Sequence, residues 1–240
     1  MRPRPDATDQ APTPCELCAA RQNCLLGQQS LEHQRQMAPF IREVNFAKGS
    51  PLLTEGVVSD TLKTIKLGTV MVTRRGPDGV ARPVALLGRS HVLGKYGVIG
   101  HETQLGGYGL SQGRLCELRV DDLQRLRLID AEFMEALHTI MVRSFGRLAD
   151  WLQVMRMHGL QRQLLATLLL LLGGEQGNRV VRLPGHLALA QVLSTSRESI
   201  VRTLNALESA GALRRVDRWH VELTEDPAAF LADDRPGNAT

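Results

Sequence analysis

Residues 187–213 constrain the fold of this chain more than any other stretch, because two short amphipathic segments there flank the tight turn Ser-Thr-Ser at 194–196. The apolar positions are Leu189, Val192 and Leu193 in the first segment and Ile200, Leu204 and Leu207 in the second. The second set falls within about 60° of a helical wheel drawn at 100° per residue. Two helices joined this closely must bury their apolar sides in a shared core. The pattern predicts a helix-turn-helix.

The polar side of the second segment carries residue types that read base edges in the DNA major groove. Arg pairs with guanine, Glu accepts from the amino group of cytosine, and Asn pairs with adenine. The candidate DNA contacts are Ser196, Arg197, Glu198, Arg202 and Asn205. Either Thr195, in a capping box with Glu198, or Ser196 begins the helix. An ordinary amphipathic helical hairpin is the alternative interpretation.

A strand pattern follows the second helix, since Trp219, Val221 and Leu223 alternate with polar residues. Three arginines nearby are suited to DNA phosphates, as in the wing of a winged helix: Arg214, Arg215 and Arg218. We therefore expect a winged-helix domain over residues 158–240. It includes a buried helix at 160–172, a turn at 173–178 and a frayed end.

A long helix is predicted over residues 121–157, which contain no proline and a single glycine. Apolar residues recur there at spacings of three and four, close to the pattern of a coiled-coil seam. The seam positions are Met134, Leu137, Met141, Phe145, Leu148, Leu152 and Met155. We expect the helix to pair with its copy in a homodimer. Packing on the core of its own chain is the alternative.

Residues 31–120 read as many short strands, because glycines interrupt brief apolar stretches throughout this region. The segment Gly-Pro-Asp-Gly at 76–79 lies between two β-branched runs and predicts a hairpin. Short strands at this spacing indicate an antiparallel barrel or jelly roll, a β-roll. The expected fold class is α+β, with a β-roll, a long dimerisation helix and a winged helix-turn-helix in that order.

Three of the four cysteines, Cys15, Cys18 and Cys24, lie within ten positions, and Cys116 follows far along the chain. We read residues 1–30 as a disordered arm and a cysteine segment. No signal peptide and no apolar run of about 18 residues is present, so we expect a cytoplasmic protein without membrane contact. Thiols stay reduced there, and clustered cysteines bind metal or do redox chemistry. The net charge of +4 permits a nucleic-acid partner without demonstrating one.

Two segments resemble the CRP/FNR family of bacterial transcription regulators. The stretch "STSRESIVRTLNALESAGAL" is similar to its recognition segment, and "KGSPLLTEGVVSDTLKTIKLGTVMV" is similar to its cyclic-nucleotide-type β-roll. The resemblance implies a transcription regulator, not an enzyme. It also implies a homodimer on double-stranded DNA, with two recognition helices in successive major grooves of a pseudo-palindrome. The base-reading Glu and Arg of the family fall on Glu198 and Arg202.

The cysteine pattern resembles the oxygen-sensing iron–sulfur branch of this family. That resemblance implies a 4Fe–4S cluster held by Cys15, Cys18, Cys24 and Cys116, and an activator of anaerobic or microaerobic genes. Nucleotide-binding members carry a Glu where Lys95 follows Gly94 here, and their Arg-Ser/Thr-Ala cassette is missing, so we expect no cyclic nucleotide. Arg197 is typical of the nucleotide-binding branch instead, which predicts an altered half-site.

Three further expectations concern regulation and partners. Leu148 stands where the oxygen-sensing branch has an acidic residue that disfavours the cluster-free dimer, so we expect a dimer that depends less on the cluster. Haem sensing of nitric oxide or carbon monoxide stays open through His91, His101 or His138, as do zinc and thiol redox chemistry. The hairpin bearing Arg74 and Arg75 is a solvated turn or, as in the family, a contact for RNA polymerase.

Overall fold

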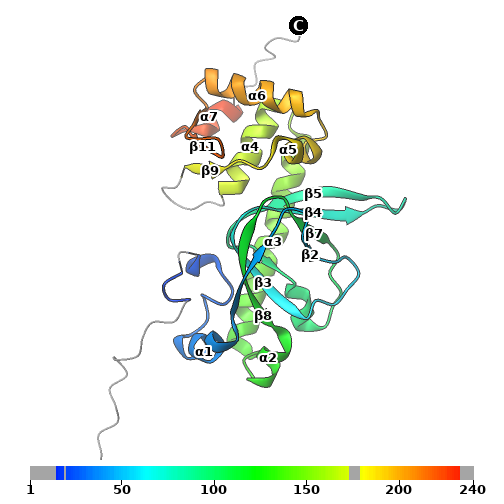
Figure 1. Ribbon diagram of the computed structural model, residues 1–240, viewed down its shortest axis with the longest axis vertical. Coiled ribbons are helices and arrows are strands. Elements are labelled where there is room, and N and C mark those ends of the chain that lie inside the picture. Colours follow the sequence, from blue (N-terminus) through cyan, green and yellow to red (C-terminus); the bar gives the residue numbers. More distant parts are fainter. Residues whose placement is uncertain (1–14, 19, 173–178, 233–240) are drawn as a thin grey trace, which may run out of the picture.

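The computed structural model describes residues 15–18, 20–172 and 179–232. The arm at 1–14, the turn expected at 173–178 and the chain end from 233 lie outside the described residues. A β-roll and a C-terminal helical domain lie one above the other, and a long helix runs behind the β-roll toward that domain (Figure 1). The α+β class, the order of its parts and the helix-turn-helix are as predicted.

The β-roll consists of two four-stranded antiparallel sheets, ordered β1-β8-β3-β6 and β2-β7-β4-β5. Its strands are β1 Arg42–Phe46, β2 Pro51–Leu53, β3 Thr61–Leu67, β4 Val70–Arg75, β5 Ala81–Leu87, β6 Val92–Leu93, β7 Gly106–Gly109 and β8 Gly113–Arg119. Phe46, Ile65, Val70 and Leu115 are buried together between the sheets. The predicted hairpin joins β4 to β5.

Short helical segments cover the ends of the β-roll. They are η1 Arg21–Asn23, α1 Leu31–Met37, η2 Ala38–Phe40 and η3 Lys95–Ile99. Ser30 begins α1, because its side chain accepts a hydrogen bond from the backbone N–H of His33. The segment η3 lies close against the neighbouring loop: a Cβ on Gly97 would clash with the carbonyl oxygen of Ser59. Only glycine fits at that position.

The long helix predicted over 121–157 is interrupted, which corrects the prediction. Its residues form α2 Val120–Arg125 and α3 Ala131–Arg156. Arg127 has a φ of 55°, a left-handed conformation that ends α2. Asp130 then begins α3 by accepting a hydrogen bond from Phe133 N–H at 3.0 Å. Neither proline nor glycine marks the break, but burial of Leu128 between the two helices favours it.

The C-terminal domain contains α4 Leu160–Leu172, β9 Val180–Arg182, α5 His186–Val192, α6 Arg197–Ser209, β10 Leu213–Arg215, β11 His220–Leu223 and α7 Pro227–Ala232. The strands form one antiparallel sheet in the order β10-β11-β9. Leu164 and Leu168 of α4 are buried against Leu189 of α5 and Ile200 and Leu204 of α6. The helix expected at 160–172 is therefore present and buried.

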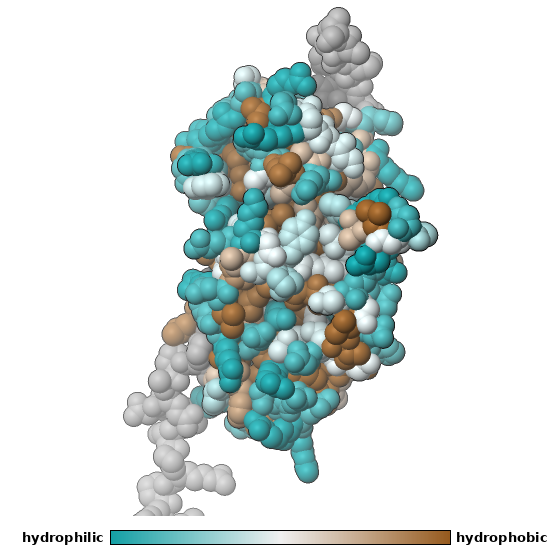
Figure 2. Space-filling model, turned by 45° about the vertical axis from the view of Figure 1, so that its right-hand side comes forward, coloured by the Kyte–Doolittle hydropathy of each residue, from teal (hydrophilic) through white to brown (hydrophobic). Residues whose placement is uncertain are grey.

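One apolar core joins the C-terminal domain to the β-roll. Met71 of β4 and Leu86 of β5 belong to the same buried cluster as Leu164 and Leu189. Apolar side chains on the viewed face occur in separate small patches among polar ones (Figure 2). Among the described residues, no helix is both long and apolar enough to cross a membrane.

Candidate nucleic-acid interface and cysteine centre

Ser196 is the N-cap of α6, which decides between Thr195 and Ser196, the two candidates that the sequence left open. The hydroxyl of Ser196 accepts a hydrogen bond from the backbone N–H of Ser199 at 3.1 Å. Thr195 belongs to the turn instead, where its N–H donates to the carbonyl of Ala190 at 2.9 Å. Ser194 has a φ of 51°, so the sharp reversal occurs one residue earlier. The helix starts one residue later than the capping box requires.

The two sides of α6 differ as predicted in their exposure. Ile200, Leu204 and Leu207 are buried in the domain core. The five candidate DNA contacts are exposed along the opposite side: Ser196, Arg197, Glu198, Arg202 and Asn205. Arg202 donates a hydrogen bond to the hydroxyl of Ser199 at 3.2 Å, which holds its stem along the first turns of the helix. The face therefore presents guanidinium and carboxylate groups to solvent from a rigid element.

The wing, which consists of β10, β11 and the turn between them, contacts α6, and the sequence did not predict these contacts. Arg215 of β10 donates to the side-chain carbonyl of Asn205 at 2.6 Å. The same guanidinium makes an ion pair with Glu208 at 2.7 Å. A candidate base reader and a candidate phosphate contact are thus joined to each other. Arg214 is paired with Glu222 at 2.5 Å.

Arg218 lies in the turn between β10 and β11, and its guanidinium stacks on the ring of Trp219 at 4.8 Å. His186, at the start of α5, is a nearby residue that the sequence did not single out. Burial, followed by the positive charges of Arg197 and Arg215, lowers its pKa. The lowered pKa reflects the positive charge that Arg197 of α6 and Arg215 of β10 place near this ring. No local motif contains His186, since only the tertiary fold brings it there.

Cys116 lies in the middle of the sheet, and this position explains how a distant thiol meets the N-terminal segment. Strand β8 pairs with β1 and β3, so Cys116 stands between Glu43 and Thr64. The thiol of Cys24 lies 3.6 Å from the hydroxyl of Thr64. Cys24 and Cys116 therefore adjoin the same residue of β3. All four cysteines are free thiols.

The four thiols lie close enough to affect each other's ionisation. Burial raises the pKa of Cys15 to about 12, and the charges of Cys24, Cys116 and Cys18 contribute to the rise. Burial also raises the pKa of Cys116 to about 11, against the lowering effect of Lys66. Without a cation among them, these two thiols stay protonated at neutral pH. The structure brings the four predicted residues into one region.

No three His, Cys, Asp or Glu side chains within the described ranges are arranged to hold a metal ion. A single zinc ion would need sulfurs within about 4 Å of each other, because Zn–S bonds are about 2.3 Å long and tetrahedral. A 4Fe–4S cluster takes one thiolate per iron and so needs a wider spacing. The described side chains are therefore not set at the spacing of a single-ion site.

The histidines proposed as haem ligands lie in different surroundings. Nδ1 of His91 contacts the carbonyl oxygen of Gly88 at 3.0 Å, and Nε2 contacts the guanidinium of Arg147. Both ring nitrogens are thus engaged, which leaves neither of them free to bind iron. His101 lies in the loop after η3, and His138 lies on α3.

The seven predicted seam residues of α3 are not all exposed: some are buried in their own chain and others face solvent. Leu137 is only 1% exposed and belongs to the core of its own chain. Phe145 and Leu152 are 76% and 65% exposed, and Met134 is exposed as well. Val142, which the prediction omitted, is also exposed. We call Met134, Val142, Phe145 and Leu152 the exposed stripe.

Met141, Leu148 and Met155 are partly buried and pack against the cores of their own chain. The prediction that Leu137 faces a partner is therefore wrong, and Leu148 contributes only part of its surface to any seam. The reason is that α3 packs its Phe133, Leu137 and Ile140 side against the β-roll end of the molecule. Because that side is buried, the exposed apolar side of α3 includes Val142 in place of Leu137.

Lys95 is partly buried at the start of η3, with its ammonium 5.4 Å from the centre of the Tyr96 ring. Burial lowers the pKa of Lys95 to about 8. A cation at this position cannot accept a hydrogen bond from a ribose hydroxyl. The side chain thus offers the opposite chemistry to a glutamate at this position.

Residues 146–229 match the family model described as the Crp-like helix-turn-helix domain. The C-terminal part of this chain is a Crp-like domain. Comparison with curated proteins finds no match. The match begins within α3 and ends in α7, so the Crp-like domain includes α4, the wing and the helix-turn-helix.

Solved structures resemble about four fifths of the chain. FixK2 from Bradyrhizobium japonicum is 15% identical, with a TM-score of 0.65, over 79% of this chain and 94% of that one. A CRP-family transcriptional regulator from Thermus thermophilus is 20% identical, with a TM-score of 0.56, over 78% and 93%. A CRP/FNR-family regulator from the same organism is also 20% identical, with a TM-score of 0.56, over 81% and 100%. The β-roll, α3 and the Crp-like domain together have the fold of these regulators.

Proposed function

We propose that this protein is a sequence-specific DNA-binding transcription regulator that acts in the cytoplasm as a homodimer. The observation that carries the proposal is the exposed polar side of α6 within the Crp-like domain. Its Arg, Glu and Asn side chains are those that read base edges, and the buried side of the same helix fixes their orientation.

The residues of α6 divide the work of recognition. Glu198 and Arg202 are one turn apart on the exposed side and are placed to contact adjacent base pairs. Arg197 adds a third base-reading group at the helix start. Arg215 donates a hydrogen bond to Asn205, and this contact allows two roles for Asn205. Asn205 reads adenine if Arg215 turns away to a DNA phosphate, or it stays bound and orients Arg215 toward the DNA backbone.

Replacement of Arg202 provides the test of the DNA-binding proposal. The variant Arg202→Ala loses a base contact, and we expect its affinity for the selected site to fall by about 1–3 kcal/mol with relaxed specificity at one position. Fluorescence anisotropy on a site selected from random duplexes measures this. Arg179→Ala is the matched control, since Arg179 pairs with Glu222 and Glu225 and is not among the candidate base contacts. Equal affinity of wild type and Arg202→Ala with a folded domain would contradict the proposal.

The exposed stripe on α3 supports the homodimer. Four apolar side chains in a row on a long helix are costly in water, and burial against a second copy removes that cost. A symmetric pair of α3 helices would place two α6 helices about one DNA turn apart, as a pseudo-palindromic site requires.

We further propose that Cys15, Cys18, Cys24 and Cys116 hold an oxygen-labile 4Fe–4S cluster. Four free thiols from the N-terminal segment and the middle strand β8 supply one ligand per iron. Their raised pKa values, at Cys15 and Cys116, are consistent with a site completed by cations, because iron replaces the thiol protons. Bound there, the cluster supplies an oxygen-sensitive link between the N-terminal segment and the sheet. Its loss in oxygen would free that segment and lower DNA binding, so that activation would be confined to anaerobic or microaerobic conditions.

Metal analysis tests the cluster directly. The full chain purified without oxygen should contain about four irons and four acid-labile sulfides, and Cys116→Ser should lose both. Gln112→Ala, a change at an exposed residue just before β8, is the control. Zinc in place of iron would support the zinc alternative, and a Soret band would support haem. Metal-free protein with an oxidisable thiol pair would support redox sensing; each of these outcomes overturns the cluster.

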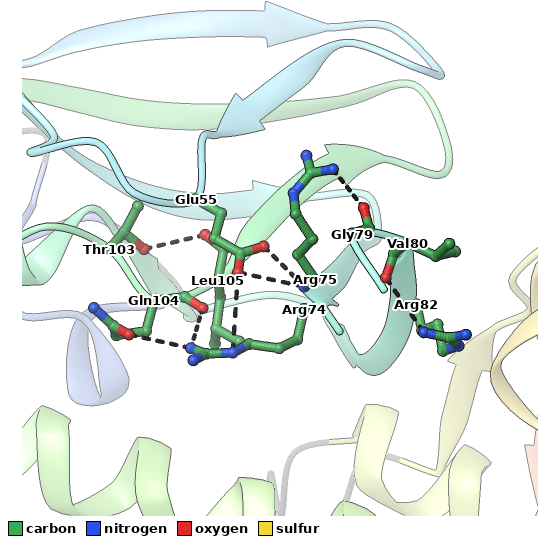
Figure 3. A network of polar contacts seen from close by, with 9 residues as sticks. All are labelled: Glu55, Arg74, Arg75, Gly79, Val80, Arg82, Thr103, Gln104 and Leu105. Atoms are coloured by element: carbon green, nitrogen blue, oxygen red, sulfur yellow. Dashed lines mark hydrogen bonds and ion pairs between the residues drawn. The ribbon is translucent and has the colours of Figure 1, made fainter. Parts of the chain in front are cut away.

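The β4–β5 hairpin is our proposed contact for RNA polymerase, although its arginines are held by neighbours (Figure 3). Arg74 donates to the backbone carbonyl of Gln104 at 2.5 Å and lies 3.9 Å from Glu55. Arg75 donates to the carbonyl of Gly79 at 2.7 Å. Charge reversal at both arginines should lower activation without affecting DNA affinity. Unchanged activation would contradict this contact.

A further inference from the structure

A cavity of about 300 Å³ lies where the β-roll, α3 and the Crp-like domain meet. Its walls come from the β3–β4 turn, the β5–β6 turn, the end of α4, and strands β9 and β11. Figure 1 shows β9 at the edge of the Crp-like domain that faces the β-roll. The cavity is distinct from the exposed side of α6 and from Lys95. Any molecule within it would touch both domains.

The walls carry an excess of positive charge. Five of the lining residues have basic side chains: Lys66, Arg89, Arg147, Arg182 and His220. Two of these, Lys66 and His220, are paired with carboxylates outside the lining, Glu43 and Asp217. Among the described residues that line the cavity, none is Asp or Glu. Such a concentration of one sign in a recess attracts an oppositely charged ligand.

Two of these guanidinium groups lack a carboxylate partner. Arg147 contacts the neutral ring of His91 and makes no ion pair with a described carboxylate. Burial, and then the charge of Arg143, lower its pKa, and the charge of Asp150 offsets this only in part. Arg182 likewise has no ion pair within the described part of the chain, although Arg179, three residues earlier, has two. Half-buried charges without partners are costly unless an anion joins them.

A buried hydroxyl points to the same chemistry. Oγ of Ser90 is inaccessible to solvent and has no hydrogen-bond partner among the described residues. Ser90 lines this cavity, and its backbone has a φ of 68°, a conformation that a serine rarely adopts. A buried donor without an acceptor costs free energy, and an oxygen-rich anion would supply that acceptor.

We propose that this cavity binds a small polyanion, a metabolite bearing phosphate or carboxylate groups, that bridges the β-roll, α3 and the Crp-like domain. Arg147 and Arg182 neutralise its charge from α3 and β9, and Ser90 donates from the β5–β6 turn. Its size suits a compact metabolite, at the lower end of ordinary ligand pockets. Because the ligand joins two domains, its binding changes the DNA affinity of the regulator, and DNA changes the affinity for the ligand by the same factor.

Calorimetry of the full chain with pyrophosphate, and separately with citrate, tests the binding site without DNA. Ionic strength is held constant with chloride. We expect wild-type protein to bind at least one of these anions, and Arg182→Gln and Ser90→Ala to bind it at least about tenfold more weakly. Arg179→Gln is the matched control and should bind like wild type. Equal binding by all four proteins would mean surface adsorption, and no binding of either anion at millimolar concentration would equally overturn the proposal.

A second measurement tests regulation, and this part rests on the proposed function. The DNA affinity of wild type should change several-fold when the bound anion is added, while that of Arg182→Gln should not. Unchanged affinity in the wild type would overturn the bridging role. If the protein binds no DNA at all, the proposed function fails, but calorimetry still decides whether the cavity is an anion site.

Discussion

His91 shows how a single buried side chain links the β-roll to α3. Its Nδ1 contacts the carbonyls of Gly88 and Arg89, and its Nε2 contacts Arg147 of α3. Burial first, and the charge of Arg147 second, lower the pKa of His91 from 6.5 to about 3. The ring is therefore neutral in the folded protein, with Nδ1–H as donor and Nε2 as acceptor.

The depressed pKa of His91 predicts a pH dependence of stability. Below its ordinary pKa of 6.5 the unfolded chain binds a proton that the folded chain excludes down to about 3. The unfolded state thus binds more protons, so stability falls as the pH drops through this window, by up to about 1.4 kcal/mol per pH unit. The free energy of unfolding, measured with urea at about pH 7 and about pH 5, should change less between the two pH values in His91→Gln than in wild type. Equal differences would refute this assignment.

At the scale of elements, α3 illustrates how one helix serves two surfaces. Its Phe133, Leu137 and Ile140 side is buried in the chain's own core, while the exposed stripe lies next to it. The side chains of the stripe lie within an arc of about 80° on a helix of 3.6 residues per turn. That width suits packing against one further helix.

Phe145, the most exposed member of the stripe, should anchor the dimer. We expect Phe145→Ser to weaken self-association by at least about 100-fold, since each protomer forfeits about 2 kcal/mol of apolar burial. Sedimentation equilibrium over a range of protein concentrations measures the change. Arg143→Ser is the control, because Arg143 lies about 160° away around the same helix. Dimers of equal strength in both variants would place the interface elsewhere.

At the scale of the molecule, the β-roll and the Crp-like domain share one apolar core. The core that includes Met71 and Leu86 of the β-roll continues to Leu189 of the helix-turn-helix. Asn23, which precedes Cys24, lines the same cavity as Arg182 and His220. Through Asn23 and this cavity, a change at the four cysteines can therefore reach β9 and β11 of the Crp-like domain over a short distance.

We predict that the dimer persists when the cluster is lost. Leu148 was the sequence-based reason, but part of its surface is buried in its own chain. The stronger reason is that all four members of the exposed stripe are apolar, so no like charges meet across the seam. Cluster-free protein should sediment as a dimer at micromolar concentration while its DNA affinity falls. A monomer under these conditions would show that the cluster holds the dimer together.

The sequence predicted features that depend on neighbours along the chain. The Ser194–Ser196 turn, the apolar side of α6 and the β4–β5 hairpin follow from local periodicity and turn residues. The break before α3 was missed because no proline or glycine marks it, and Asp130 acts as a helix cap only once Leu128 is buried. The resemblance of two motifs indicated the β-roll and the Crp-like domain beyond what periodicity shows.

By itself, the sequence determined the α+β class, the helix-turn-helix and the residues that α6 presents, because each depends on side chains a few positions apart. Only the tertiary structure decided that Cys116 lies beside Cys24, that Arg215 bonds to Asn205, and which side of α3 is free. It also placed Arg147, Arg182 and Ser90 around one cavity. Such contacts join residues far apart in the chain, and they form only when the sheets and helices bury their apolar sides in one particular packing.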